Sequence, residues 1–174
     1  MTAIVEQLLH FGRRAAGTRV RADLRAVARE AAQLVLSAAK KRDIEICIEE
    51  QREPVWADVN LAEMEQVISN LLLNAVQASP RGARVCVELG RCEIEGAEGG
   101  PQRAAFIAVH DRGTGIAPEH LAHIFDPFFT TKEVGEGTGL GLSVSFGIVN
   151  DHGGRIDVES RHGQGSIFRV LLPS

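Results

Sequence analysis

A stripe of amide and acidic side chains lies along one face of the predicted helix from 61 to 78. Its members, which recur at spacings of three and four residues, are Glu63, Gln66, Asn70, Asn74 and Gln77. An ordinary solvated face carries more long charged side chains than this one. Asparagine oxygens suit Mg²⁺, which takes oxygen ligands and keeps several waters. The stripe therefore predicts a wall of a polar pocket, although alone it is also typical of a plain surface face.

A carboxylate and two close glycines follow the predicted strand at 106–110. The sequence there reads Asp111-Arg-Gly113-Thr-Gly115-Ile116. The carboxylate of Asp111 can accept a hydrogen bond from an exocyclic amine such as that of adenine, and glycine lets the backbone approach a ligand closely. A structural turn would use the same residues, so this motif is weak when it stands alone.

A glycine-rich loop opens the predicted helix at 140–150. It reads Gly135-Glu-Gly137-Thr138-Gly139-Leu140-Gly141-Leu142. The N–H groups and the dipole at a helix N-terminus favour a phosphate. The loop is not a Walker motif because no GKS or GKT follows, and it is not a dinucleotide fingerprint because it does not directly follow a strand. It indicates phosphate binding in a different nucleotide fold.

The elements that must position these residues follow from the spacing of apolar side chains. Helical spacing predicts amphipathic helices at 23–41 and 61–78, besides the one at 140–150. Alternation predicts strands at 44–48, 55–58, 85–92, 106–110, 155–158 and 166–172, and we expect the first two to pair as a hairpin. A turn at 98–101 and a long, irregular, functional loop at 112–138 complete the pattern. The predicted class is an α/β two-layer sandwich, with helices on a mixed, mostly antiparallel sheet.

Composition narrows the classes of protein. The 174 residues, 44% of them apolar, suit one globular domain. The apolar runs are too short for a membrane-spanning helix, and the basic pair after the first apolar stretch is the reverse of a secretory signal, so we expect a cytoplasmic chain without membrane contact. A net charge of −4 with scattered basic residues argues against nucleic acid. Three cysteines without a CxxC pair predict reduced thiols and no zinc site.

Taken together and in order, these motifs resemble those of sensor histidine kinases. The sequences Asn70-LLL-Asn74-A, DRGTGIA, IFDPFFTTK, GEGTGLGL and GQGSIF look like the N, G1, F, G2 and terminal glycine boxes of that family. The family lies within a wider ATPase superfamily that includes gyrase and MutL, and the TTK and GTGLGL wording is similar to the nitrogen-regulation type of kinase. The resemblance implies a Bergerat-type fold, with 19–174 as the ATP-binding catalytic domain and 1–18 as a linker or the end of a dimerisation helix.

The resemblance also implies roles for the matching residues. Asn74 would coordinate Mg²⁺ with Asn70 assisting, Asp111 would take the adenine amine, and Lys132 would bring a charge to the terminal phosphates from a mobile lid. Gly113 and Gly115 would lie against the base. The full set implied to hold ATP and Mg²⁺ is Asn70, Asn74, Gln77, Asp111, Gly113, Gly115, Ile116, Thr130, Thr131, Lys132, Gly137, Thr138, Gly139, Leu140, Gly141 and Leu142.

Two departures from the family pattern matter. Many members carry a lysine or arginine where this chain has Gln77, and we expect Lys132 to supply the missing charge. The phosphoacceptor box, a histidine followed by an acid and then a proline, is absent, and His10 has the wrong neighbours to be the acceptor. His120 and His123 are assigned no site role.

The expected function is therefore that of a histidine kinase catalytic domain. It would present the terminal phosphate of Mg-ATP to a histidine on dimerisation helices absent from this chain and, through them, serve a response regulator. Gyrase-like relatives have a water-activating glutamate at the position of Asn70, and an amide cannot act as a general base, so we expect neither rapid hydrolysis nor autophosphorylation of the chain alone. We expect a monomer or a weak dimer through 1–18. The alternatives are an anti-sigma-type serine kinase and a nucleotide-gated interaction module without turnover.

Overall fold

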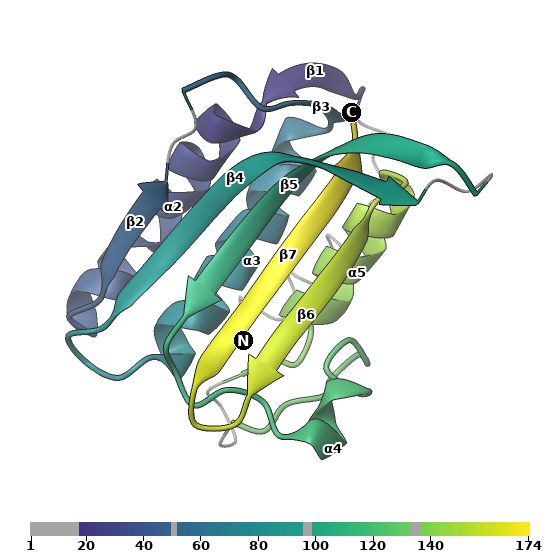
Figure 1. Ribbon diagram of the computed structural model, residues 1–174. Helices are drawn as coiled ribbons and strands as arrows, with labels where there is room; N and C mark the ends of the chain where they lie inside the picture. The colour runs from purple at the N-terminus through teal and green to yellow at the C-terminus, as the bar shows by residue number, and fades with distance from the viewer. Residues whose placement is uncertain (1–17, 50–51, 96–98, 133–136) are drawn as a thin grey trace.

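A five-stranded sheet carries helices on one of its two faces in the computed structural model, which describes residues 18–49, 52–95, 99–132 and 137–174 (Figure 1). The strand order is β2 (Glu45–Glu49), β4 (Arg84–Glu95), β5 (Pro101–Asp111), β7 (Gly165–Pro173) and β6 (Arg155–Arg161). The helices are α2 (Leu24–Lys41), α3 (Leu61–Ala78) and α5 (Gly141–Asp151). Within this sheet only β2 and β4 run parallel. The predicted class, helices on a mixed, mostly antiparallel sheet, is confirmed.

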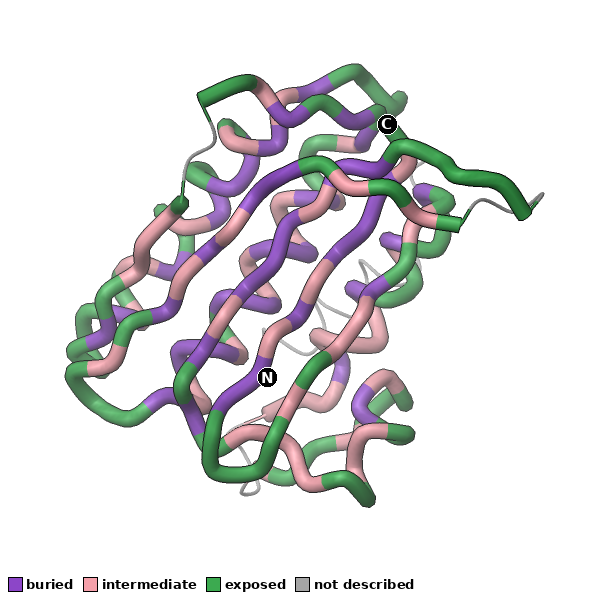
Figure 2. Tube along the Cα trace, viewed as in Figure 1, coloured by how far each residue is buried: buried purple, intermediate pink, exposed green. Residues whose placement is uncertain are grey.

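The core lies between the sheet and the helices. In β4 the alternate residues Val85, Val87 and Leu89 are fully buried, so these side chains form the helix-facing surface of the strand. The apolar stripe of α3 is buried along its whole length, at Met64, Val67, Ile68, Leu71, Leu72 and Ala75. Figure 2 shows this as buried stretches that alternate along the strands and recur along the helices. Because the apolar stripe of α3 faces the core, the stripe of amide and acidic residues lies on another side of the helix, where its residues are half-buried.

A second, two-stranded sheet lies at one end of the domain. Here β1 (Val20–Asp23) pairs antiparallel with β3 (Trp56–Val59). The expected hairpin between the strands at 44–48 and 55–58 is therefore wrong. Instead β2 pairs parallel with β4, as in the register Cys47 to Cys86. Strand β1 is absent from the predicted elements, because it is only four residues long and runs directly into a helix.

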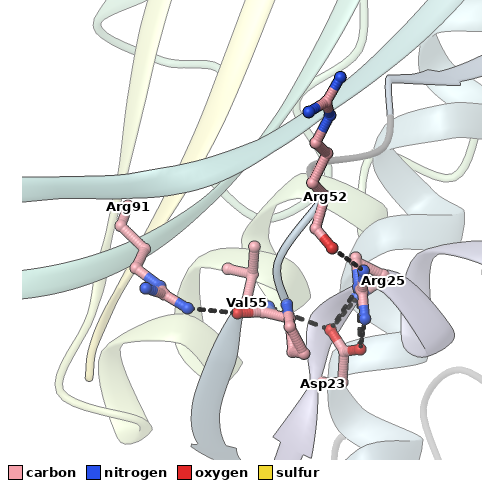
Figure 3. A network of polar contacts seen from close by, with 6 residues as sticks. Asp23, Arg25, Arg52, Val55 and Arg91 are labelled. Atoms are coloured by element: carbon pink, nitrogen blue, oxygen red, sulfur yellow. Dashed lines mark hydrogen bonds and ion pairs between the residues drawn. The ribbon is translucent and has the colours of Figure 1, made fainter.

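A polar network explains why the segment before β3 joins β1 (Figure 3). Asp23 caps α2 and binds the guanidinium of Arg25 at 2.7 Å, and its Oδ1 accepts the N–H of Val55 at 3.2 Å. Burial alone would raise the pKa of Asp23, but the hydrogen bonds from Arg25 and from Val55 outweigh it and hold the pKa below its ordinary value. Arg91 reaches over from β4 to the carbonyl of Pro54 at 2.5 Å. The chain after Pro54 is thus fixed beside β1.

The cysteines differ from the expectation of three reduced thiols. Cys47 and Cys86 form a disulfide with a Cα–Cα distance of 4.7 Å, and Cys92 is free. The two bonded cysteines are direct register partners on β2 and β4, and their sequence separation of 39 residues hides that proximity from any spacing rule. On β4, Cys86 alternates with the buried Val85 and Val87, so the bond lies on the sheet face away from the helices.

The remaining expectations concern the loops and the chain ends. The strands that flank the expected turn, β4 and β5, do pair as an antiparallel hairpin. The described part of the irregular stretch contains a short helix, α4 (Pro118–Leu121). Residues 1–17 of the 1–18 segment, expected to be a linker or the end of a dimerisation helix, lie outside the described residues, so this assignment stays a prediction. Within the described residues, no helix combines the length and the apolar character needed to cross a bilayer.

Candidate functional site

A cavity of about 1090 Å³ opens between α3, the segment after β5 and the loop before α5. This volume is slightly above the range for small-molecule sites, about 300–1,000 Å³. The cavity brings together most of the residues predicted from the sequence, namely Asn70, Asn74, Gln77, Asp111, Gly115, Ile116, Thr130, Thr131, Lys132, Gly137, Thr138, Gly139, Gly141 and Leu142. Gly113 and Leu140 are the two predicted residues that do not line it.

The α3 wall presents amide oxygens to a positive charge. The ammonium of Lys132 donates to Asn74 Oδ1 at 3.3 Å and to Gln77 Oε1. These oxygens lie one turn apart because positions 74 and 77 share a helix face. Among the described residues, no cluster of three His, Cys, Asp or Glu could hold a metal ion. A cation here would depend on amide oxygens, and the ammonium shows that they accept one.

Helix α5 is tied to α3 at both of its ends. At the first turn of α5, the Asn70 amide donates to the carbonyl of Gly141 at 3.3 Å. At the last turn, the buried ring of His152 accepts the N–H of Asn60, which caps α3, at 3.0 Å, and its other nitrogen donates to the carbonyl of Ile148 at 2.8 Å. The two helices that carry the amide stripe and the glycine loop are therefore held in one relative position.

Asp111 is the buried carboxylate of the site, with 8% of its surface exposed. Its Oδ1 accepts the N–H of Gly113 at 2.8 Å, and the backbone N–H of Ser166 on the neighbouring strand also donates to the carboxylate. Burial raises the pKa of Asp111 above its ordinary value, more than these two hydrogen bonds and the nearby His110 lower it. The charged carboxylate can accept a hydrogen bond from a ligand in the cavity. Its burial makes the charged form less favourable than it would be in water.

The two glycines near Asp111 are close to protein backbone. A Cβ at Gly113 would overlap the carbonyl of Ala78, and one at Gly115 would overlap the carbonyl of Arg161. Gly113 therefore lies behind the cavity lining, where its N–H orients Asp111, and its implied contact with a base stays a prediction. Gly115, with φ of +64°, remains at the cavity.

The segment expected to form the lid, which contains Thr130, Thr131 and Lys132, begins and ends at a backbone contact between Phe128 and Gly139. The N–H of Phe128 donates to the carbonyl of Gly139 at 2.9 Å, and both residues have positive φ, +68° and +67°. Between these two residues along the chain, Thr130, Thr131 and Lys132 line the cavity. Gly137 also lines it and lies against the side chains of Thr130 and Lys132. Residues 133–136 lie outside the described part of the chain.

The start of α5 differs in detail from the expectation. Leu140 is buried, and its N–H donates to Thr138 Oγ1 at 3.3 Å. Leu140 thus contributes to packing, whereas Gly141 and Leu142 line the cavity.

Several residues of the cavity are absent from the set predicted from the sequence. His120, which is assigned no role above, lines the cavity with its ring 5.6 Å from that of Phe129, whereas His123 is exposed and bonds Asp126 at 2.8 Å. The other missed residues include the apolar Leu73, Ile124, Phe129 and Phe168 and the polar Thr114, Glu119, His162 and Ser166. Most of these residues lie in the motifs quoted above, which could have revealed them. Ser166 and Phe168 lie in GQGSIF, and Ile124 and Phe129 lie in IFDPFFTTK. Leu73 and Thr114 lie in the boxes around Asn70 and Asp111, whereas Glu119 and His162 lie outside every motif.

Comparisons with known proteins agree with this geometry. Residues 59–174 match the family described as histidine kinase-, DNA gyrase B- and HSP90-like ATPases. Sensor kinase CckA of Brucella abortus is 39% identical over 98% of this chain, and sensor histidine kinase ZraS of Salmonella typhimurium is 36% identical over 99% of it. Among solved structures, the catalytic domain of histidine kinase ThkA superposes with a TM-score of 0.74 at 29% identity, covering 89% of this chain and 95% of that one.

The relatives are longer than this chain. It spans 19% of the length of CckA and 35% of that of ZraS. Full-length ShkA, solved in complex with AMPPNP, gives a TM-score of 0.77 at 26% identity, with 98% of this chain and 35% of that one covered. The relatives do not single out the nitrogen-regulation type of kinase, which stays a prediction.

Proposed function

We propose that this chain, which belongs to the family of histidine kinase-, DNA gyrase B- and HSP90-like ATPases, binds Mg-ATP in the cavity beside α3 and presents the terminal phosphate to a histidine on dimerisation helices. It is a histidine-kinase type of ATPase domain, homologous to those of sensor kinases. Because it spans a minor part of its relatives, the activity and the partners of the whole protein belong to the proposal.

The observation that carries the proposal is the pairing of two unlike walls in one cavity. Asp111 lies where the β5 strand ends, and the amide oxygens of Asn74 and Gln77 lie on α3 with the ammonium of Lys132 against them. The cavity is lined by both sets. A base with an exocyclic amine and a chain of phosphates with a cation would satisfy the two ends together.

At the base end, Asp111 would accept the adenine amine. Its Oδ1 is held by Gly113, so the carboxylate is already oriented before a ligand binds. The apolar side chains of Ile116, Ile124 and Phe168 line the same cavity and suit the faces of a purine ring.

At the phosphate end, Asn74 would ligate Mg²⁺ with Asn70 assisting. Bound there, the metal would neutralise phosphate charge, and it takes oxygen ligands of the kind that the stripe offers. Lys132 would move from the amide oxygens to the phosphates. The backbone at Gly137, Gly139 and Gly141 would face the phosphates, and Thr130, Thr131 and Thr138 would lie beside them.

The chain would transfer the phosphoryl group and not hydrolyse ATP quickly. Asn70 occupies the position from which a general base would act, and its amide cannot take a proton from water. Phosphoryl transfer depends mainly on positioning and charge stabilisation, so the acceptor must be brought to the cavity by another helix.

The partners are proposed from the kind of protein to which the relatives belong. Sensor kinases supply a histidine on paired dimerisation helices and act through a response regulator in the cytoplasm, and we assign this chain the same arrangement, with a monomer or weak dimer through 1–18. The relatives are sensor kinases, which does not favour the anti-sigma-type serine kinase. Phosphoryl transfer to a supplied helix pair separates the kinase from an interaction module without turnover.

Calorimetric titration with ATP, with and without Mg²⁺, tests the binding half of the proposal. The wild-type chain should bind ATP more tightly with Mg²⁺, and Asn74→Ala should lose that gain while keeping its affinity for adenosine. Absence of ATP binding by the folded wild-type chain would remove the proposal.

A further inference from the structure

Ser145 is a fully buried polar residue of α5, and it touches the amide of Asn70. Its hydroxyl donates to the carbonyl of Gly141 one turn earlier, at 2.8 Å. Asn70 Nδ2 donates to that same carbonyl at 3.3 Å and to Ser145 Oγ at 3.4 Å. The three groups form a closed triangle between α3 and α5.

This triangle permits one orientation of the Asn70 amide. The single hydroxyl proton of Ser145 is used on Gly141, so toward Asn70 the oxygen can only accept. The Gly141 carbonyl has no proton and can also only accept. If the amide were rotated by half a turn, its Oδ1 would meet two acceptors, with no hydrogen between them. The NH₂ end therefore faces α5, and Oδ1 is left for the cavity that Asn70 lines.

The neighbouring amide is oriented from the opposite side. Asn74 Oδ1 accepts from Lys132, a residue of the lid segment, which would leave when a ligand binds. Asn70 is oriented from behind, by a buried residue of a rigid helix. The orientation of Asn70 therefore does not depend on the lid.

We propose that Ser145 is a positioning residue, which fixes the Asn70 amide so that its oxygen is available to Mg²⁺ and the phosphates. The proposal rests on the proposed function, because it gives Asn70 its place at the metal. Ser145 does not line the cavity and acts only through Asn70.

The test is a double-variant cycle on Ser145→Ala and Asn70→Ala, measured by titration with AMPPNP in Mg²⁺ and in EDTA. Ser145→Ala should lose about tenfold of the Mg²⁺ enhancement, a loss typical of residues that orient metal ligands, with its affinity in EDTA unchanged. In the Asn70→Ala background the same substitution should have no further effect. Ser143→Ala is the matched control, since Ser143 also donates to a carbonyl of its own helix, that of Leu140 at 2.9 Å, and does not line the cavity.

A second measurement needs neither nucleotide nor metal. In the wild-type chain the side-chain NH₂ of Asn70 should exchange slowly in NMR spectra, and Ser145→Ala should accelerate the exchange while Ser143→Ala does not.

Equal Mg²⁺ enhancement in wild type, Ser143→Ala and Ser145→Ala would overturn the positioning role, and so would an Asn70→Ala variant that keeps the full enhancement. In both of those cases binding of Mg-AMPPNP by the wild type would still support the proposed function. No binding by the wild type would overturn the function itself.

Discussion

The ammonium of Lys132 lies 3.3 Å from the side-chain oxygen of Asn74, so a residue of the lid segment occupies the oxygen proposed for the metal. The same ammonium donates to Gln77, the position at which many sensor kinases carry a cation of their own. An amide at 77 thus gives Lys132 an acceptor, where a second cation would repel it. The departure at Gln77 and the placement of Lys132 are two parts of one arrangement.

The first prediction follows from this pairing. Lys132→Met should weaken ATP binding by about 1.5–3 kcal/mol, the range for hydrogen bonds to charged groups, and leave adenosine binding unchanged. Calorimetry with both ligands measures this. The double variant Gln77→Lys with Lys132→Met should recover part of the loss, because it returns a cation to the cavity from α3. Lys40→Met, on the exposed end of α2, is the control, and a loss of equal size there would refute the site-specific account.

The second prediction concerns Asp111, whose charge should favour ligand binding although its burial disfavours that charge in the folded chain. Asp111→Asn should weaken ATP binding by about 1–3 kcal/mol, because the charged acceptor for the adenine amine is lost. Calorimetry with ATP and GTP measures the binding. Asp58→Asn, at an exposed position of β3, should change neither binding nor stability. Unchanged ATP affinity in folded Asp111→Asn would remove this residue from the site.

The pH dependence of Asp111 gives a third prediction. Burial raises its pKa in the folded state above the unfolded value, so the folded chain binds the proton more tightly. The contribution of this group to stability is therefore fully present below the unfolded pKa and is lost as the pH rises through the folded pKa. Denaturant titrations should show the free energy of unfolding of wild type falling, relative to that of Asp111→Asn, as the pH rises through that window. A difference that is constant with pH would contradict the raised pKa.

The sequence predicted the local elements better than their pairing. The helix at 61–78 matches α3 to the residue, because Asn60 is a good N-cap and the apolar stripe of α3 is uninterrupted. The pairing of β3 with β1 was out of reach, because it depends on Asp23 accepting the N–H of Val55, a contact across 32 residues. The same limit hid the disulfide between Cys47 and Cys86.

Most of the polar residues of the site were predictable from the sequence, whereas most of its apolar walls were not. Asn70, Asn74 and Asp111 lie in boxes of fixed spacing, and all three line the cavity. Gly113 packs against Ala78 and does not line the cavity, and its sequence context does not distinguish such a glycine from one that lies beside a ligand. The apolar walls include Ile124 and Phe129, which lie in the IFDPFFTTK motif. An apolar side chain in a motif can equally pack in the core, so only the fold places these two at the cavity.

The fourth prediction sets two glycines against each other. Gly139→Ala should destabilise the chain by more than about 1 kcal/mol, because its φ is +67° and a Cβ would overlap the backbone of Phe128 at the lid base. Gly147→Ala, in the exposed interior of α5 with open space around it, should stabilise by about 0.5–1 kcal/mol. Thermal unfolding measures both. A stabilising Gly139→Ala would show that the Phe128–Gly139 closure does not hold the lid segment.

The last prediction concerns the phosphoryl acceptor. Incubated alone with ATP and Mg²⁺, the chain should hydrolyse ATP very slowly and gain no acid-labile phosphoryl group. The amide of Asn70 cannot act as a general base toward water. Its NH₂ group faces Gly141, and the amide oxygen that faces the cavity is too weakly basic to take a proton.

With a separately purified helix pair that carries a His-Glu box, that histidine should become phosphorylated, because the missing element is a nucleophile held in line with the terminal phosphate. Mass spectrometry under neutral conditions reads both mixtures, and a helix pair with glutamine in place of the histidine is the control. The rate should rise with the concentration of the helix pair, since a weak encounter between separate chains limits it. Phosphohistidine at His10 in the chain alone would give the chain its own acceptor. Rapid turnover without any helix pair would instead indicate a water-activating group that Asn70 cannot supply, and an ATPase of the gyrase type.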